Sequence, residues 1–503
     1  MRTSRPHVPE TFHRVAAALS GILLLLGYAP VECVPLLFVG LIPILWATQN
    51  TEAKRSWRLG YLFGFVYSLG QFHGLYQLVG RLTGSGGLAL IPWVLFSGAM
   101  ATYFSLAGWL IKRCFAAERP WLIPFVWAGV EVFRSYIPVL AFPWGLLASP
   151  LAKYPALIQL AHFGTIYLVG AWIVAVNLGL LLAYQRLKGQ TKPELEAVLL
   201  WSAAATLPLG SVLVYLRPVQ TQPLRVTLGQ TGYDMAFDSP AADVRVDMRI
   251  LGFIREARAA GSKMLILPED ITHEQVTGDF FAFPFDPDVP IVFGAVRAGS
   301  GGRIYQSAVG FDGQWHNADK VRLMLFGEYV PFRQYLPLAN MFKVVGKDMS
   351  PGEQGPQPIE VGGVKIGPLL CFESLFPDLG YRQEQNGAQF LAVMSNDDWF
   401  MNSSIPEQLR DGGIWRAVET GLPVARVASL GYSLACNSKG RVIARAPLRA
   451  GAAITADLPV PTSRPSVILL PAFPLASILL TLAIPFIRPR RSSARRTTPC
   501  PQP

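Results

Sequence analysis

Long apolar runs dominate the first 216 residues and return once near the end of the chain. Several approach the ~20 residues that a helix needs to cross the hydrocarbon core of a bilayer. The pattern predicts eight membrane-spanning helices, at residues 15–30, 35–47, 59–79, 87–111, 120–140, 163–184, 195–216 and 467–486. The first two runs are short, and the alternative for them is a tight helical hairpin.

Between residues 217 and 463 the pattern changes to short alternating segments. β-Branched apolar stretches predict strands at 224–228, 264–267, 291–296, 307–311, 369–372, 390–394 and 424–427. Residues 243–260 and 405–420 have the periodicity of amphipathic helices. This alternation predicts a layered α/β domain. We therefore expect a seven-helix membrane domain at 1–216, an α/β domain at 217–463, and an eighth span with a basic tail at 464–503.

Basic residues gather in alternate loops between the apolar runs. The rich loops contain clusters at 54–58, 112–119 and 186–192, whereas the loop after the third span has Arg81 alone. Because basic loops stay on the cytoplasmic side, the N-terminus and the rich loops are predicted to be cytoplasmic. The α/β domain then lies outside the cytoplasm, and the eighth span returns the C-terminus to the inside.

The composition agrees with a multi-pass membrane protein. Hydrophobic residues make up 51% of the chain and charged residues 15%, against about 25% charged in an average soluble domain. The net charge is +11, but the basic residues lie in short clusters beside apolar runs and form no nucleic-acid-binding motif. We therefore expect no nucleic-acid partner. The five cysteines have neither metal-ligand spacing nor a paired framework. We expect no metal and no cofactor.

Three chemically active side chains follow predicted strands of the α/β domain. Glu269 ends the segment MLILPE, Lys320 follows a strand and a turn, and Cys371 ends the run VKIGPLLC. Active sites of open α/β sheets form outside the carboxyl ends of strands. There, a carboxylate, an ammonium group and a thiol supply a base, an oxyanion stabiliser and a nucleophile for acyl transfer. A helix beginning just after Cys371 would lower the pKa of its thiol. The alternative for each residue alone is an ordinary one, such as a buried structural cysteine.

The motifs around these residues resemble those of the nitrilase superfamily. They are LPE at 267–269, a lysine followed by FGEYVP at 326–331, CFES at 371–374 and SNDDWF at 395–400. In the membrane part, Trp127, Glu131, Arg134 and the FPW of residues 142–144 resemble a second signature. With the predicted spans, the whole chain resembles the apolipoprotein N-acyltransferase family, a membrane-bound branch of that superfamily.

The resemblance implies a fold and a site. The fold is a multi-span helical membrane domain carrying an extracytoplasmic nitrilase-like αββα sandwich. In the implied site, Glu269 is the general base that takes the proton of Cys371. Lys320 and the backbone N–H of Phe372 stabilise the oxyanion, and Glu328 holds Lys320. The implied supporting residues are Glu328, Phe372 and Glu373, and the candidate substrate-binding residues are Phe237, Trp144, Tyr329 and Trp399.

The resemblance also implies a reaction. An acyl chain passes from a phospholipid, expected to be phosphatidylethanolamine, to Cys371. The resulting thioester is attacked by the N-terminal α-amine of a diacylglyceryl-cysteine apolipoprotein, which gives ping-pong kinetics. The protein is expected to be a monomer in the inner membrane of the cell. Aromatic segments at 280–284 and 329–345 are candidate substrate-facing lids, the alternative being packing on the domain core.

Several positions depart from the pattern of the family. They are Leu325, Phe372, Phe237 and the stretch 427–433. None removes a catalytic group, but together they bear on acceptor specificity. Two alternatives therefore stay open: an amidase or paralogous acyltransferase with another acceptor, and a catalytically inactive lipid- or lipoprotein-binding membrane protein.

Overall fold

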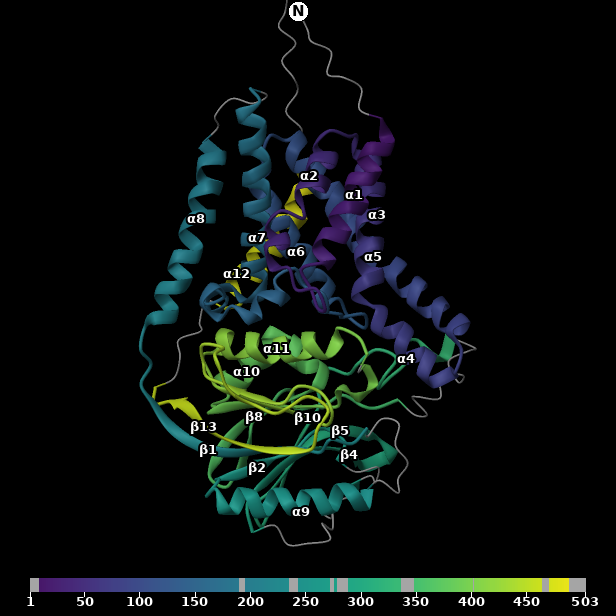
Figure 1. Ribbon diagram of the computed structural model, residues 1–503. Coiled ribbons are helices and arrows are strands. Elements are labelled where there is room, and N and C mark those ends of the chain that lie inside the picture. The colour runs from purple at the N-terminus through teal and green to yellow at the C-terminus, as the bar shows by residue number, and fades with distance from the viewer. Residues whose placement is uncertain are drawn as a thin grey trace, which may run out of the picture.

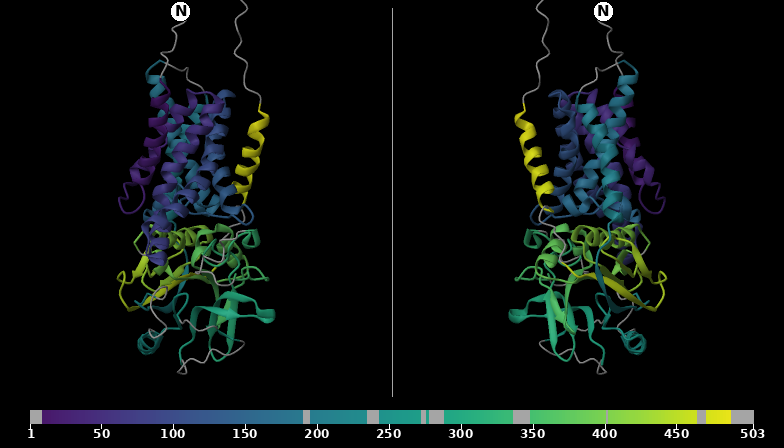
Figure 2. Two further views of the ribbon diagram at one scale, coloured as in Figure 1. Left: turned by 90° about the vertical axis from the view of Figure 1, so that its right-hand side faces the viewer. Right: turned by 90° about the vertical axis from the view of Figure 1, so that its left-hand side faces the viewer.

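The structure is a computed structural model that describes residues 9–189, 195–234, 243–271, 276–277, 288–335, 348–400, 402–463 and 470–487. A helical part stands on a part built from two β-sheets (Figure 1). The chain completes the first helices, builds both sheets, and then returns to the helical part through the helix α12, Ala472–Ala483 (Figure 2). α12 packs closely on α6 at Gly129. A side chain would not fit there, because its Cβ would lie 2.7 Å from the carbonyl oxygen of Ser477.

The helical part follows the predicted apolar runs with changed boundaries. Its first helices are α1 (Glu10–Leu25), η1 (Val34–Phe38), α2 (Ile42–Gln49), α3 (Ala53–Gln71), α4 (His73–Thr83) and α5 (Gly86–Ala116). They are followed by α6 (Ile123–Tyr136), α7 (Ala161–Leu187) and α8 (Leu195–Leu216). Among the described residues, α5 and α7 are long and apolar enough to cross a membrane, and shorter apolar helices lie at Val34–Gln49, Thr206–Leu216 and Ala472–Phe486.

Several predicted spans differ from the observed helices, among them the run at 35–47, which is divided between η1 and α2. The run at 59–79 is wrong as one helix, because α3 ends at Gln71 and α4 starts at His73 in a new direction (Figure 1). The break lets Phe72 pack edge-on against the ring of Phe142 at 5.5 Å. α6 covers only 14 of the predicted residues, and α7 is interrupted at Gly164 and Thr165. Tertiary contacts of this kind are invisible to a hydropathy pattern.

One sheet has seven strands and the other has six. The first has the order β13-β1-β2-β4-β5-β6, with β3 paired to β4. Its strands are β1 (Thr221–Gln230), β2 (Met264–Ile266), β3 (Val276–Thr277), β4 (Ile291–Ala298), β5 (Ile304–Phe311), β6 (Trp315–Asp319) and β13 (Ala452–Pro461). The second has the order β12-β11-β10-β9-β8-β7. Its strands are β7 (Ile359–Val361), β8 (Val364–Leu370), β9 (Phe390–Ser395), β10 (Val424–Ala428), β11 (Leu434–Cys436) and β12 (Val442–Arg445).

The two sheets form the centre of an α–β–β–α sandwich. In each sheet the central strands are parallel: β1, β2 and β4 in the first, and β8, β9 and β10 in the second. Helix α9 (Asp243–Ala259) covers one outer face, and α10 (Pro377–Gln385) and α11 (Ile405–Thr420) cover the other (Figure 1). The layered α/β prediction is confirmed. The strand predicted at 369–372 is wrong in extent, because β8 ends at Leu370.

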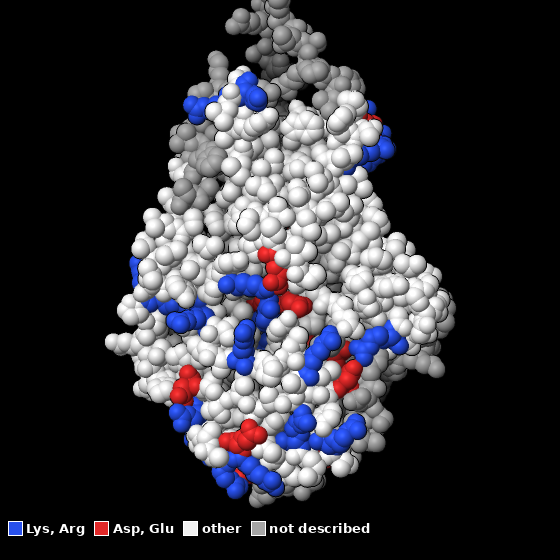
Figure 3. All heavy atoms as spheres, viewed as in Figure 1, with Lys and Arg blue, Asp and Glu red and all other residues white. Residues whose placement is uncertain are grey.

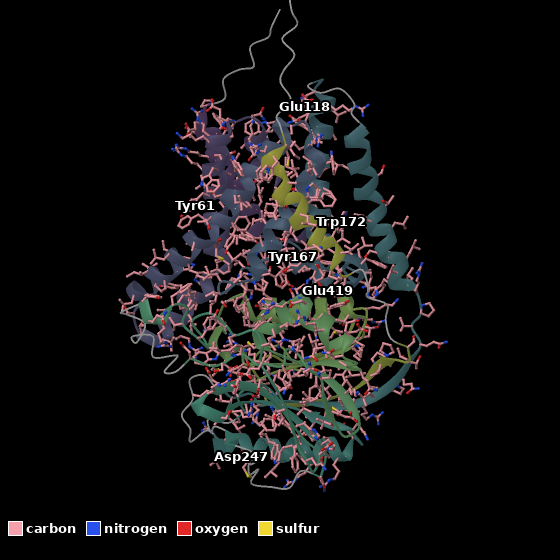
Figure 4. The ribbon with its side chains drawn as sticks, turned by 180° about the vertical axis from the view of Figure 1, so that it is seen from behind. Tyr61, Glu118, Tyr167, Trp172, Asp247 and Glu419 are labelled. Carbon is pink, nitrogen blue, oxygen red and sulfur yellow. The ribbon has the colours of Figure 1, made fainter. Side chains whose placement is uncertain are left out.

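Helix α11 lies between the second sheet and the helical part. Nearly all of its residues are buried, so the prediction of an amphipathic helix is wrong: both of its faces are covered. Arg416 and Glu419 form a buried ion pair at 2.7 Å, and Glu419 accepts the N–H of Ile166 at the interruption of α7. Glu419 lies at this junction, with Tyr167 just above it (Figure 4). A single apolar core therefore runs from the helical part to the second sheet.

Charged side chains are unevenly distributed over the surface. On the face of Figure 3, the middle of the helical part is free of lysine, arginine, aspartate and glutamate, whereas such side chains gather at its far end and over the sandwich. Arg113, in the last turn of α5, donates to the carbonyl of Pro485 at 2.6 Å. A charge-free band with charged margins is the surface that a bilayer covers.

Candidate active site

Cys371 occupies the turn that leaves β8. It is the first residue of a five-residue 3-10 turn, Cys371–Leu375, and its backbone has φ of 48°. This left-handed conformation is strained for a residue with a side chain, and such strain is common where a strand presents a nucleophile to a site. The hydroxyl of Ser374 donates to the carbonyl of Cys371 at 2.7 Å and helps to hold the turn.

The predicted lowering of the thiol pKa is wrong. The turn is short, and the sulfur is buried, with Cys371 only 7% exposed. Burial raises the pKa of the Cys371 thiol, the charge of Glu269 raises it further, and Lys320 opposes both. Since the resting group is then a protonated thiol, this nucleophile requires a base to remove its proton.

Lys320 lies between two carboxylates just beyond the end of β6. Its ammonium donates to Glu269 Oε1 at 3.2 Å and to Glu328 Oε1 at 2.5 Å, and its side chain is 1% exposed. Burial by itself lowers the pKa of Lys320, but Glu269 and Glu328 more than offset this and hold that pKa well above its ordinary value. The site therefore contains a fixed positive charge in a water-poor environment.

Glu269 follows β2 and is held from two sides. Lys320 donates to Oε1, and the backbone N–H of Asn396 donates to Oε2 at 3.3 Å. A Cβ at Gly294 on β4 would lie 2.7 Å from the Glu269 Cα, so the glycine permits this close approach. Burial raises the pKa of Glu269 above its ordinary value even though Lys320 lowers it. A raised carboxyl pKa suits a base that must take and return protons near neutrality.

Two further glutamates hold the backbone around the site. Glu373 Oε1 accepts the N–H groups of Val321 and Arg322 at 2.7 and 3.0 Å, and its Oε2 accepts that of Leu370 at 3.0 Å. It thereby joins the turn of the cysteine to the segment after Lys320. Glu328 Oε2 accepts the N–H of Met324 at 2.8 Å, which fixes the carboxylate that faces the lysine.

The helical part supplies an aromatic wall to the turn of the cysteine. The ring of Phe372 lies 5.4 Å from Trp144 and 5.9 Å from Phe142, and Trp144 also contacts Phe400 at 5.8 Å. Among the described residues, the buried indole N–H of Trp144 has no hydrogen-bond partner. The FPW segment and CFES segment, distant in sequence, therefore meet beside the nucleophile.

The other candidate substrate-binding residues are dispersed. The hydroxyl of Tyr329 donates to the carbonyl of Val139 at 2.7 Å, so this side chain joins the sandwich to the helical part. Trp399 lies in the 3-10 turn Asp397–Phe400 after β9, packed against the shared core. Phe237 lies outside the described residues, as do the lid segment 280–284 and most of 329–345.

A buried ion pair below the site was missed from the sequence. Arg426 on β10 donates to both carboxylate oxygens of Asp397, at 2.8 and 3.0 Å, and both side chains are fully buried. Ser395 donates to Asp397 at 2.6 Å. The sequence feature that could have indicated this pair is an arginine inside the otherwise apolar strand VARVA, because a buried arginine requires a carboxylate partner.

Comparisons with known proteins cover most of the chain. A family profile described as the apolipoprotein N-acyltransferase N-terminal domain matches residues 20–179, and one described as carbon-nitrogen hydrolase matches residues 276–465. An apolipoprotein N-acyltransferase of Rhizobium etli is 30% identical over 473 residues, covering 84% of this chain and 86% of the relative. One of Geobacter metallireducens is 27% identical over 469 residues, covering 86% of each.

Two solved structures are each similar to about half of this chain. An amidase from Nesterenkonia covers 48% of this chain and 92% of its own, with 19% identity and a TM-score of 0.35. A nitrilase-superfamily protein of Saccharomyces cerevisiae covers 52% of this chain and 96% of its own, with 19% identity and a TM-score of 0.36.

Proposed function

The chain belongs to the apolipoprotein N-acyltransferase family, and we propose that it transfers an acyl chain from a phospholipid to an apolipoprotein through a thioester on Cys371. The observation that supports this reaction best is the buried cluster of Glu269, Lys320 and Cys371 at the junction with the helical part. A thiol, a base and a fixed cation are the groups that acyl transfer requires. Their position brings a nucleophile to the side of the sandwich from which lipid chains would arrive.

The first half of the proposed reaction forms the acyl-enzyme. Glu269 takes the proton of Cys371 as the sulfur attacks the ester carbonyl of the phospholipid. The ammonium of Lys320 and the backbone N–H of Phe372 stabilise the tetrahedral oxyanion. When the C–O bond breaks, Glu269 returns its proton to the leaving lysophospholipid, and a thioester remains on the sulfur.

The second half of the reaction consumes the thioester. The N-terminal α-amine of the apolipoprotein attacks the thioester carbonyl and gives its proton to Glu269. The C–S bond then breaks, the amide product leaves, and the sulfur recovers the proton from Glu269. Because the lysophospholipid leaves before the amine reacts, the kinetics are ping-pong. The buried Trp144 indole N–H is available to a substrate oxygen on the aromatic wall.

The placement in the membrane is also a proposal. The charge-free band of the helical part (Figure 3) and the basic clusters at 54–58 and 112–119 favour eight spans with both termini in the cytoplasm. The domain boundaries at 216 and 463 follow from that arrangement. The α/β sandwich then lies on the periplasmic side of the inner membrane, the donor is phosphatidylethanolamine, and the protein acts as a monomer.

The test is to trap the acyl-enzyme. Purified protein in detergent is mixed with phosphatidylethanolamine carrying a labelled sn-1 chain, without acceptor, and its cysteine peptides are examined by mass spectrometry. We expect a hydroxylamine-labile acyl group on Cys371 that is absent from Cys371→Ser. Cys436→Ser is the matched control, since Cys436 is fully buried on β11, and it should acylate normally.

Two other results would contradict the proposal. Absence of the adduct with every phospholipid tested would favour an inactive binding scaffold. An adduct that is consumed by water as fast as by a diacylglyceryl-cysteine peptide would instead indicate a membrane-bound amidase.

A further inference from the structure

A helical hairpin projects from the helical part beside the sandwich. We call residues His73–Leu95, which comprise α4 and the first turns of α5, the membrane arm (Figure 1). Its large apolar side chains are between 40% and 68% exposed; they are Leu82, Leu88, Leu90, Ile91, Val94 and Leu95. The arm continues the charge-free surface of the helical part on the face of Figure 3. These side chains therefore fit the lipid bilayer that the helical part occupies.

Arg81 joins the membrane arm to the sandwich. Its guanidinium donates to the backbone carbonyl of Asp398 at 2.8 Å and to the carboxylate of Asp234 at 2.7 Å. The arm also touches the start of α11, where a Cβ at Gly74 would lie 2.4 Å from Ile405 Cδ1. Arg81 is the one basic residue in the loop after the third predicted span, and the proposed reaction does not use it.

The contact of Arg81 continues to the catalytic base. The N–H of Asp398 donates to Asn396 Oδ1 at 3.2 Å, and the N–H of Asn396 donates to Glu269 Oε2 at 3.3 Å. The side chain of Asp398 accepts the N–H of Leu430 at 3.1 Å. A displacement of the Asp398 carbonyl therefore moves the turn at residues 396–398, and this turn donates a hydrogen bond to Glu269.

We propose that Arg81 is a positioning residue that couples the seating of the membrane arm in the lipid to the orientation of Glu269. The bilayer sets the depth of the arm through its leucines, and Arg81 transmits this position to the turn at residues 396–398. When the arm is displaced, the N–H of Asn396 moves away from Glu269, and the carboxylate loses one of its donors. The inference deepens the proposed function and rests on it for the role of Glu269 as base.

The test follows the reactivity of Cys371 toward iodoacetamide as a function of pH, in the full-length protein in detergent or lipid nanodiscs. Among the described residues, the other titratable groups that face Glu269 are Lys320, Asp270, Glu328 and Cys371, and all are retained in the variants. Loss of a donor to the carboxylate favours its protonated form. The midpoint of the profile should therefore rise by about one pH unit in Arg81→Ala.

Three variants make this test specific. Gly74→Leu, which pushes the arm off α11, should shift the midpoint in the same direction, and Arg81→Lys should restore part of the wild-type value. Arg225→Ala is the matched control, because it removes an exposed pair with Asp457 far from the arm, and it should leave the profile unchanged. The rate of acylation by phosphatidylethanolamine at neutral pH should fall about tenfold in Arg81→Ala.

The outcomes separate this inference from the proposed function. If wild-type Cys371 alkylates but takes no acyl chain from any phospholipid, the proposed function fails while the alkylation profiles still test the coupling. An unchanged midpoint in both Arg81→Ala and Gly74→Leu overturns the inference. A lower alkylation rate at an unchanged midpoint overturns it as well, because that result indicates a merely structural contact.

Discussion

Removal of Arg426 should destabilise the sandwich strongly, because it leaves a buried carboxylate without its counter-charge. Arg426 donates to both oxygens of Asp397, at 2.8 and 3.0 Å, and neither side chain is exposed. In Arg426→Met an apolar side chain of similar length is kept. Among the described residues, Asp397 then retains one side-chain donor, Ser395. Breaking a buried pair in this way costs about 3–5 kcal/mol.

The expected change in melting temperature follows from the size of the domain. For domains of about 150–250 residues, 1 kcal/mol corresponds to about 2–4 °C, so Arg426→Met should lower the melting temperature of the sandwich by about 6–20 °C. The assay is thermal unfolding in detergent, followed by maleimide labelling of Cys436. This thiol is fully buried on β11, the strand that pairs with β10, so it reports the unfolding of this sheet.

A double variant tests the reasoning. Arg426→Met combined with Asp397→Asn removes both charges, and the asparagine oxygen can still accept from Ser395. It should therefore be more stable than Arg426→Met alone. A single variant that melts within about 2 °C of the wild type, or a double variant that is less stable than the single one, would refute this role of Arg426.

The remaining predictions concern the site. Glu269→Gln should slow acyl-enzyme formation by about 10²–10⁴, the contribution of a positioned base, and a rate within a few-fold of wild type, measured by transfer of labelled acyl chain, would contradict that role. Acylation should fall as the pH is lowered through the raised pKa of Glu269, because the protonated carboxyl cannot take the proton of Cys371; an acid midpoint at or below the ~4.3 of an exposed glutamate would refute this. Lys320→Met should move the alkylation midpoint of Cys371 to higher pH, since the cation that lowers the pKa of Glu269 is gone. A shift to lower pH would show that a group other than Glu269 sets this midpoint. Gly294→Ala should displace Glu269 and so reduce the acylation rate at unchanged substrate affinity, because the added Cβ would lie 2.7 Å from the Glu269 Cα. Kinetics identical to those of the wild type would show that the backbone at Gly294 and Glu269 can move apart without disturbing the base.

Some features of this protein were determined by its sequence alone. The apolar segments before Glu269 and Cys371 predicted strands, and β2 and β8 end three and one residues before them. The alternation of segments predicted the sandwich, and the motifs predicted the family. These inferences succeed because hydrophobic period and length are local properties, and they indicate whether a segment forms a strand or a helix.

Only the tertiary structure decided how the parts meet. The break between α3 and α4, the burial of α11 on both faces and the contact of Trp144 with Phe372 each depend on residues more than 50 positions away. The thiol of Cys371 shows why this matters: the sequence predicted a lowered pKa from a helix start, whereas burial and the charge of Glu269 raise it. A pKa, like the second face of a helix, is determined by the groups that folding brings near, and no local pattern contains them.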